Sequence, residues 1–145
     1  MEQKIEPLSE ADAARIEKQR DWVRDHYDPE VRHQYDTIEG KLWLLETILR
    51  KNWIEPSETR KLQSLGITFG DALVQKMGLF WVAVEDQYGR DPALNDRGTT
   101  ILIFPLTTIS KRVERGETVD VHELFADACG TIARLRTELS GYTAH

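Results

Sequence analysis

Two short runs of strand-forming residues interrupt a chain whose other apolar residues recur at helical spacing. These runs, residues 80–84 and 100–104, are rich in β-branched and aromatic side chains, and Pro105 ends the second because proline cannot donate to a strand ladder. A turn joins them, which predicts a small antiparallel β-hairpin. A pair of strands alone is only marginally stable in water, so helices or a second copy of the chain must cover this one.

Start signals predict two helices before the first strand run. Ser9 is a good N-cap residue, and Asp28 followed by Pro29 is a strong start signal for a second helix. Apolar residues at alternating steps of four and three follow the second signal: Val31, Tyr35, Ile38, Leu42, Leu45 and Leu49. The two helices are expected to form an antiparallel hairpin over residues 9–54. Residues 42–49 are apolar nearly all round, so other elements or another chain must cover them.

Three further helices complete the predicted fold. The first opens near Ser57 and ends at Gly78; Gly66 and Gly70 lie on one of its faces and predict close packing there. A short helix covers residues 107–115, and the last runs from the N-cap Asp120 to about residue 139. The order α-α-α-β-β-α-α predicts an α+β fold, with a helical N-terminal hairpin and further helices packed around the β-hairpin. Residues 1–145 are predicted to form one domain, in which residues 55–139 follow the helical hairpin.

Composition indicates the cellular compartment and disfavours some classes of partner. The net charge of −6 disfavours nucleic acid, and the N-terminus lacks the apolar centre of a signal peptide. No apolar run approaches the roughly 20 residues of a membrane helix. The single cysteine, Cys129, excludes an internal disulfide. We therefore expect a cytoplasmic protein without membrane or nucleic-acid partners. No metal or cofactor is expected, since the histidines show no ligand spacing: His26, His33, His122 and His145.

Charged residues gather at two places, which together form the candidate polar site. One is the turn after the first strand, and the other is the short helix; the candidate residues are Asp86, Arg90, Asp91, Lys111, Arg112 and Arg115. Arginines could clamp a carboxylate or phosphate there. Alternatively, the turn charges keep a loop soluble, the cations complement a helix dipole, and Arg112 pairs with an acid such as Asp86. No catalytic residue is assigned.

Several strings between residues 58 and 125 resemble a bacterial family, the domain-of-unknown-function family 3806. They include Leu65-Gly66 with Phe69-Gly70, residues 81–86 (WVAVED), residues 89–91 (GRD), residues 104–107 (FPLT), residues 109–112 (ISKR) and residues 114–117 (ERGE). The resemblance implies a small bacterial α+β domain and carries over no catalytic residue. It implies recurrent charges at Asp86, Arg90, Asp91, Arg112 and Glu117, which form either a site or a salt-bridge lattice.

Three functional hypotheses follow. The leading one is a non-enzymatic domain that acts by protein contact, first of all by forming a homodimer, because residues 42–49 are strongly apolar and the hairpin is small. The alternative is a small-ligand-binding domain or enzyme with its site between the 86–91 turn and the 107–115 helix. The third is an immunity-type or adaptor protein that neutralises a basic partner, which the net charge of −6 suits.

Overall fold

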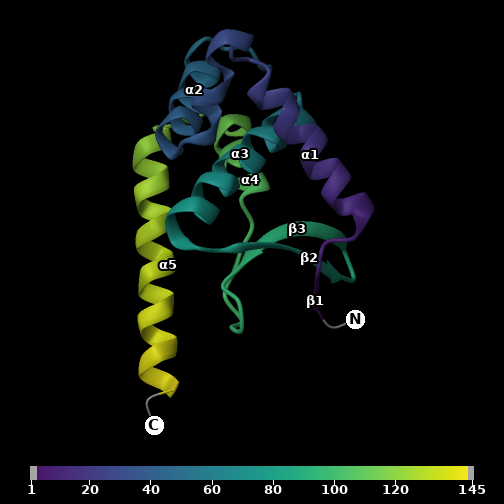
Figure 1. The fold of residues 1–145 in the computed structure, drawn as a ribbon, viewed down its shortest axis with the longest axis vertical. Helices are drawn as coiled ribbons and strands as arrows, with labels where there is room; N and C mark the ends of the chain where they lie inside the picture. The colour runs from purple at the N-terminus through teal and green to yellow at the C-terminus, as the bar shows by residue number, and fades with distance from the viewer. Residues whose placement is uncertain (1–2, 144–145) are drawn as a thin grey trace.

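Helices pack around one small antiparallel sheet in the computed structural model, which describes residues 3–143. Within these residues the elements are β1 (Lys4–Glu6), α1 (Glu10–Arg24), the 3-10 helix η1 (Pro29–Asp36), α2 (Ile38–Arg50), α3 (Thr59–Met77), β2 (Phe80–Asp86), β3 (Gly89–Asn95), β4 (Leu102–Ile103), α4 (Leu106–Glu114) and α5 (Val121–Thr143). Figure 1 shows α1, α2 and α3 at one end of the molecule, the sheet beside them, and α5 along one side. The predicted α+β class is confirmed.

Helix α3 is the centre of the molecule, because α1, α2, α4 and α5 all pack on it. All seven residues 64–70 are buried. A Cβ atom on Gly66 would lie 2.5 Å from the Leu106 Cα, and one on Gly70 would lie 2.6 Å from the Trp81 ring. The prediction that these glycines allow close packing is therefore confirmed. They let α4 and β2 approach the central helix.

The first helix begins as predicted. The Ser9 hydroxyl accepts a hydrogen bond from the Asp12 amide at 3.1 Å, and the Asp12 carboxylate accepts one from the Ser9 amide at 2.9 Å. This reciprocal capping box satisfies two amides that the helix itself leaves unpaired. It also fixes the position of the Asp12 side chain.

The second predicted helix is in fact two elements, η1 and α2. The prediction of one continuous helix from Asp28 to Leu49 was therefore wrong. The break is at Thr37, whose extended backbone and hydroxyl cap α2 by accepting from the Gly40 amide at 2.9 Å. The chain folds so tightly here that a Cβ on Gly40 would lie 1.7 Å from the Gln34 carbonyl oxygen. A sequence spacing of three and four does not separate one long helix from a 3-10 turn followed by a shorter one.

Both N-terminal helices, α1 and α2, pack chiefly on α3. The apolar residues of α2 face the core, and Leu42, Leu44, Leu45 and Ile48 are all buried. The chain's own elements therefore cover most of the apolar excess predicted for residues 42–49. The exception is Trp43, which is 51% exposed and stacks on the Tyr27 ring.

The sheet differs most from the sequence prediction. Its order is β1-β2-β3-β4, all antiparallel, and the main partner of β2 is β3, with Ala83 opposite Pro92. The predicted second strand, residues 100–104, is reduced to β4, which pairs with Leu94 and Asn95 only. The β3 segment was missed because its residues, GRDPALN, do not alternate and include a proline. Pro92 is tolerated because β4 does not pair with that part of β3.

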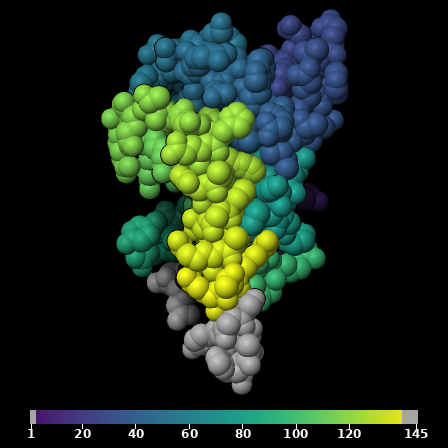
Figure 2. Space-filling view, turned by 90° about the vertical axis from the view of Figure 1, so that its left-hand side faces the viewer, coloured from purple at the N-terminus to yellow at the C-terminus, as the bar shows by residue number. Residues whose placement is uncertain are grey.

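The C-terminal helices close the fold. Asp120 caps α5 as predicted, since its carboxylate accepts from the Glu123 amide at 3.0 Å. Helix α4 begins at Leu106, one residue before the predicted start, and has no side-chain cap. Figure 2 shows α5 lying on the outside of the molecule, against α2. Arg136 of α5 reaches back to Asp96, beside the sheet, at 2.9 Å. Within residues 3–143, no helix has the length and apolar character needed to cross a membrane.

Candidate functional site

The two charged groups of the predicted polar site lie apart. The 86–89 turn closes one end of the β2–β3 hairpin, whereas α4 follows β4, which pairs at the other end of β3. This separation corresponds to about 17 Å along an extended strand. The predicted pairing of Arg112 with Asp86 is wrong: Arg112 donates to the Thr108 carbonyl at 2.7 Å, and Asp86 accepts from the Tyr88 amide at 2.8 Å.

The remaining predicted residues have separate environments. Asp91 and Lys111 are exposed, and Arg115 lies 3.6 Å from Glu117 within its own connecting segment. Arg90 pairs with Glu6 and Asp12 of the N-terminal segment. Of the six predicted residues, it is the one that lines a cleft between the N-terminal segment and the rest of the fold.

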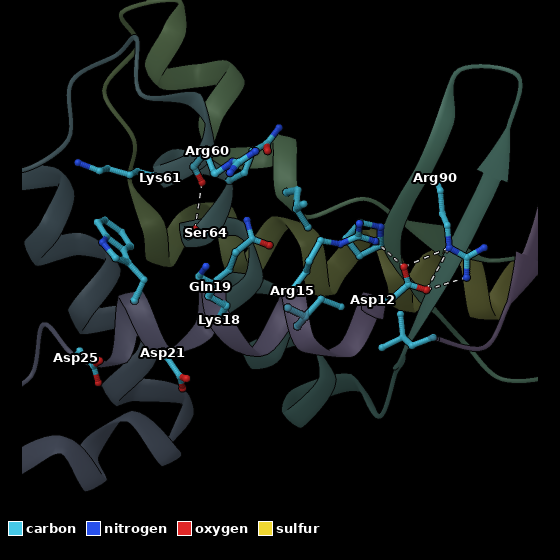
Figure 3. Close-up of a pocket in the computed structure, with 16 residues that line it drawn as sticks. Asp12, Arg15, Lys18, Gln19, Asp21, Asp25, Arg60, Lys61, Ser64 and Arg90 are labelled. Carbon is cyan, nitrogen blue, oxygen red and sulfur yellow. Dashed lines mark hydrogen bonds and ion pairs between the residues drawn. The ribbon is translucent and has the colours of Figure 1, made fainter. Parts of the chain in front are cut away.

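That cleft, the α1–α3 cleft, has a volume of about 860 Å³ and lies between α1, the first turns of α3, and β3. Figure 3 shows α1 carrying one set of side chains and α3 carrying another, with Asp12 and Arg90 together at one end. The lining residues are Leu8, Asp12, Arg15, Ile16, Lys18, Gln19, Asp21, Trp22, Asp25, Arg60, Lys61, Gln63, Ser64, Arg90, Pro92 and Leu106.

Arg90 fixes α1 against the sheet at this end. Its guanidinium Nε and Nη2 donate to the Asp12 carboxylate at 3.1 and 2.7 Å, and its Nη1 donates to Glu6 at 2.7 Å. Asp12 also accepts from Arg15 at 2.7 Å. The Arg90 hydrogen bonds are the largest cause that holds the pKa of Asp12 far below its usual range, and the Ser9 amide adds to the effect. Asp12 therefore stays ionised and serves as a structural link.

The other two acids of the cleft also have cationic partners. Asp21 pairs with Arg24 one turn along α1, and Asp25 lies 3.6 Å from Arg32 of η1. Neither partner lines the cleft. The negative charges of the cleft are thus already balanced by the protein.

The cations of the cleft are not balanced to the same degree. Lys61 pairs with Glu58 at 2.5 Å. Lys18 of α1 and Arg60 of α3 have no carboxylate within ion-pair distance among the described residues, and both are exposed. A ligand entering the cleft would therefore meet a net positive rim in a chain whose net charge is −6.

The floor of the cleft is mainly apolar and ends at an aromatic group. Ile16 and Ser64 are 4% exposed, and Trp22 is half-buried at one end. The His26 ring packs edge-on against Trp22 at 4.6 Å and stacks on Trp53 at 5.8 Å. Trp53 is 51% exposed, so the apolar surface continues from the cleft to the outside of the protein.

A second part of the α1–α3 contact is closed. Arg20 donates to both Asp71 carboxylate oxygens at 2.6 and 2.8 Å, and the Trp81 indole donates to the same carboxylate at 2.9 Å. Hydrogen bonding to Asp71 is the main cause that raises the pKa of Arg20. We refer to these three residues as the closed contact.

Beside the closed contact lie Tyr35 and Lys41, whose pKa values are shifted by burial. Burial raises the pKa of the Tyr35 hydroxyl, which hydrogen-bonds Thr68 at 2.7 Å, and burial lowers the pKa of Lys41. Lys41 donates to Gln75 at 2.6 Å. Neither residue lines the α1–α3 cleft, so these shifts mark buried, satisfied groups without access to a substrate in the cleft.

Reactive groups are sparse in the cleft. Its one hydroxyl side chain, Ser64, donates to the Arg60 carbonyl at 3.1 Å, and the lining residues include no histidine or cysteine. Burial raises the pKa of Cys129, which keeps that thiol protonated. No group of three or more potential metal ligands occurs among the described residues, and His145 lies outside them.

The sequence reasoning missed the residues of α1 and α3 that form the cleft. One signal was available: the apolar stripe of α1 is narrow, and polar residues at helical spacing flank it at Asp12, Arg15 and Gln19. The cleft itself could not be predicted, because the segments that form it are far apart in the sequence. Asp12 and Arg90, which meet at the end of the cleft, are separated by 78 positions.

Comparison with known proteins gives a family and a fold. The family model described as "Domain of unknown function (DUF3806)" matches residues 41–125, so the match begins inside α2 rather than near residue 58. No curated protein matches the chain. A crystal structure from Bacteroides thetaiotaomicron VPI-5482, at 18% identity, matches with a TM-score of 0.70 over 88% of this chain. The match covers 47% of that structure's chain, and at this identity it shows the fold alone.

Proposed function

The chain belongs to the family described as "Domain of unknown function (DUF3806)", and from this premise and the geometry of the α1–α3 cleft we propose that it is a non-catalytic binding domain. It receives a segment of a partner protein in that cleft. The proposal includes the bacterial cytoplasm as the setting. One observation carries it: an open cleft of about 860 Å³ has an apolar floor and a charged rim.

Size and position support a binding role. Ligand sites in proteins typically have volumes of about 300–1,000 Å³ and combine an apolar lining with a few polar groups. One wall of the cleft is α1, which precedes the family-matched residues 41–125; the other wall belongs to the matched part. The cleft therefore lies where the N-terminal segment meets the family-matched region. A partner placed there would contact both.

The chemistry of the lining residues favours binding over catalysis. A catalytic site needs a nucleophile or base within hydrogen-bonding reach of its partner. Asp12 is held by two arginines, and Ser64 is hydrogen-bonded to a backbone carbonyl. These groups are committed to holding the fold.

A charge-unbiased peptide selection tests the proposal. Peptides of random sequence, displayed on phage, are selected against the whole chain, and the binders are mapped by amide chemical shifts. We expect shifts on α1 and the first turns of α3. Gln19→Trp, which fills the cleft, is expected to abolish binding, whereas Gln87→Trp in the exposed β2–β3 turn is the matched control. Failure to select binders, or binders that map elsewhere, would contradict the proposal.

Self-association is a second possible form of protein contact. Two exposed tryptophans favour it, although they form a smaller apolar surface than the sequence predicted. Trp43 and Trp53 are each 51% exposed, and tryptophan is enriched among residues that dominate interface energies. Sedimentation at micromolar concentration tests it: a dimer that Trp43→Ala or Trp53→Ala dissociates supports this form, and a monomer rules it out. The third hypothesis, a basic partner, does not suit the cleft, because the cleft has a positive rim.

A further inference from the structure

Resting on the proposed function, we infer that the α1–α3 cleft takes an acidic, extended peptide segment whose carboxylates lie between Lys18 and Arg60. The inference concerns the chemistry of the partner, which the proposed function leaves open. It follows from the ion pairs of the cleft and from its apolar floor.

The first step is the charge balance of the lining residues. The three acids Asp12, Asp21 and Asp25 each have a cation within ion-pair distance. Lys18 and Arg60 have no such carboxylate among the residues that the structure describes. Bringing an anion to these two side chains breaks no existing ion pair, whereas bringing a cation leaves both repelled. The cleft therefore discriminates by charge sign.

The second step is the placement of the two cations. Lys18 lies on α1 and Arg60 in the first turn of α3, so they belong to the two walls of the cleft (Figure 3). An occupant that satisfies both must extend across the cleft. Arginine binds carboxylates through a planar fork, and lysine offers a compact charge on a long stem, so carboxylates on a flexible chain suit the pair.

The apolar floor of the cleft also limits what the occupant can be. Ile16 and Trp22 of α1 and Leu106 at the start of α4 offer apolar surface between the charged rims. A purely ionic ligand would leave this surface uncovered, whereas an extended peptide alternates its side chains between two directions. Acidic residues would then reach the rim while apolar residues cover the floor. This combination of rim and floor favours a peptide over a nucleic acid, whose charge is continuous.

The experiment compares three synthetic peptides that differ only in charge. A labelled peptide of alternating Glu and Val, its Gln-for-Glu copy and its Lys-for-Glu copy are titrated with the whole chain, and anisotropy and amide shifts are recorded. We expect the Glu peptide to bind at least about fivefold more tightly than the Gln peptide, as two exposed ion pairs would provide. The advantage should shrink as salt is raised.

Charge reversal at two places provides the matched control. Lys18→Glu with Arg60→Glu should remove the preference for the Glu peptide. Lys111→Glu with Arg115→Glu makes the same change in net charge on residues outside the cleft and should preserve the preference. Equal loss in both double variants would overturn the inference, because it would show a general charge effect.

Other outcomes separate the inference from the proposed function. If the Gln and Glu peptides bind the cleft equally, the cleft is a peptide site without charge preference, and only the inference fails. If no peptide, selected or synthetic, shifts the cleft amides, both fail. Tighter binding of single-stranded DNA than of the Glu peptide, or a dimer that Lys18→Glu with Arg60→Glu dissociates in the absence of peptide binding, would overturn the inference by identifying another occupant.

Discussion

The closed contact and the α1–α3 cleft join the same two helices and differ in how their charges are used. In the closed contact, Arg20 meets Asp71 through two hydrogen bonds, and Trp81 donates a third. In the cleft, two residues earlier on α1, Lys18 has no carboxylate partner among the described residues. Paired charge thus holds these helices in place, whereas unpaired charge is available to a partner.

The closed contact is also more buried than the two unpaired cations of the cleft. The Arg20 and Asp71 side chains are 23% and 12% exposed, whereas Lys18 and Arg60 are exposed residues. A charge that is half-desolvated without a partner is costly, whereas an exposed one is not. Mutations in the two regions should therefore act on different properties: the free energy of unfolding in one, and ligand affinity in the other.

The largest expected effect is on stability, from Asp71→Ala. This change leaves the Arg20 guanidinium and the Trp81 indole without their shared acceptor. Breaking a buried pair costs about 3–5 kcal/mol, and partial exposure here lowers the expected loss to about 2–3 kcal/mol. Urea unfolding followed by tryptophan fluorescence measures it. Asp91→Ala, at an exposed acid of β3, is the control and should change stability by less than about 0.5 kcal/mol. Equal effects of the two variants would show that the closed contact stabilises the fold no more than an exposed acid does.

An intermediate effect is expected from acid, through Asp12 at the end of the cleft. Arg90 and the Ser9 amide lower its pKa in the folded state, so the folded chain binds its proton less readily than the unfolded chain does. Its contribution is therefore complete above the unfolded pKa of about 4 and is lost as pH falls through the folded value. Thermal melts from pH 7 to pH 2 measure the stability of wild type and of Asp12→Asn. The advantage of wild type in the free energy of unfolding should shrink by about 1 kcal/mol over this range, a figure reduced for solvent screening. A constant gap between the two proteins would show that Asp12 does not titrate in this way.

Local signals in the sequence predicted three of the helix ends correctly. The Ser9 capping box, the Asp120 cap and the left-handed Gly78 after α3 each depend on a few neighbouring residues. Close packing at Gly66 and Gly70 was predictable for a similar reason, since absent side chains on one helix face leave space that a neighbour fills. These features need no knowledge of distant segments.

The sheet and the cleft depend on distant segments, and there the sequence was insufficient. β1 is three residues long and β3 contains Pro92, so neither segment has a strand pattern of its own. Both form strands by pairing with β2. Propensity in strands is easily overridden by such tertiary pairing. The missed β3 then displaced the predicted site, because the helix expected beside the 86–91 turn follows the opposite end of the hairpin.

The smallest expected effect on stability comes from the exposed cations of the cleft. Lys18→Ala and Arg60→Ala remove exposed cations that hold no carboxylate among the described residues. Each should change the free energy of unfolding by less than about 0.5 kcal/mol, since no ion pair is lost and little surface is uncovered. The measurement is the urea unfolding used for Asp71→Ala, so the three variants can be compared directly. A loss above about 1 kcal/mol in either would mean that the cation already serves the fold, and the cleft would then be a second closed contact with no charge to offer a partner.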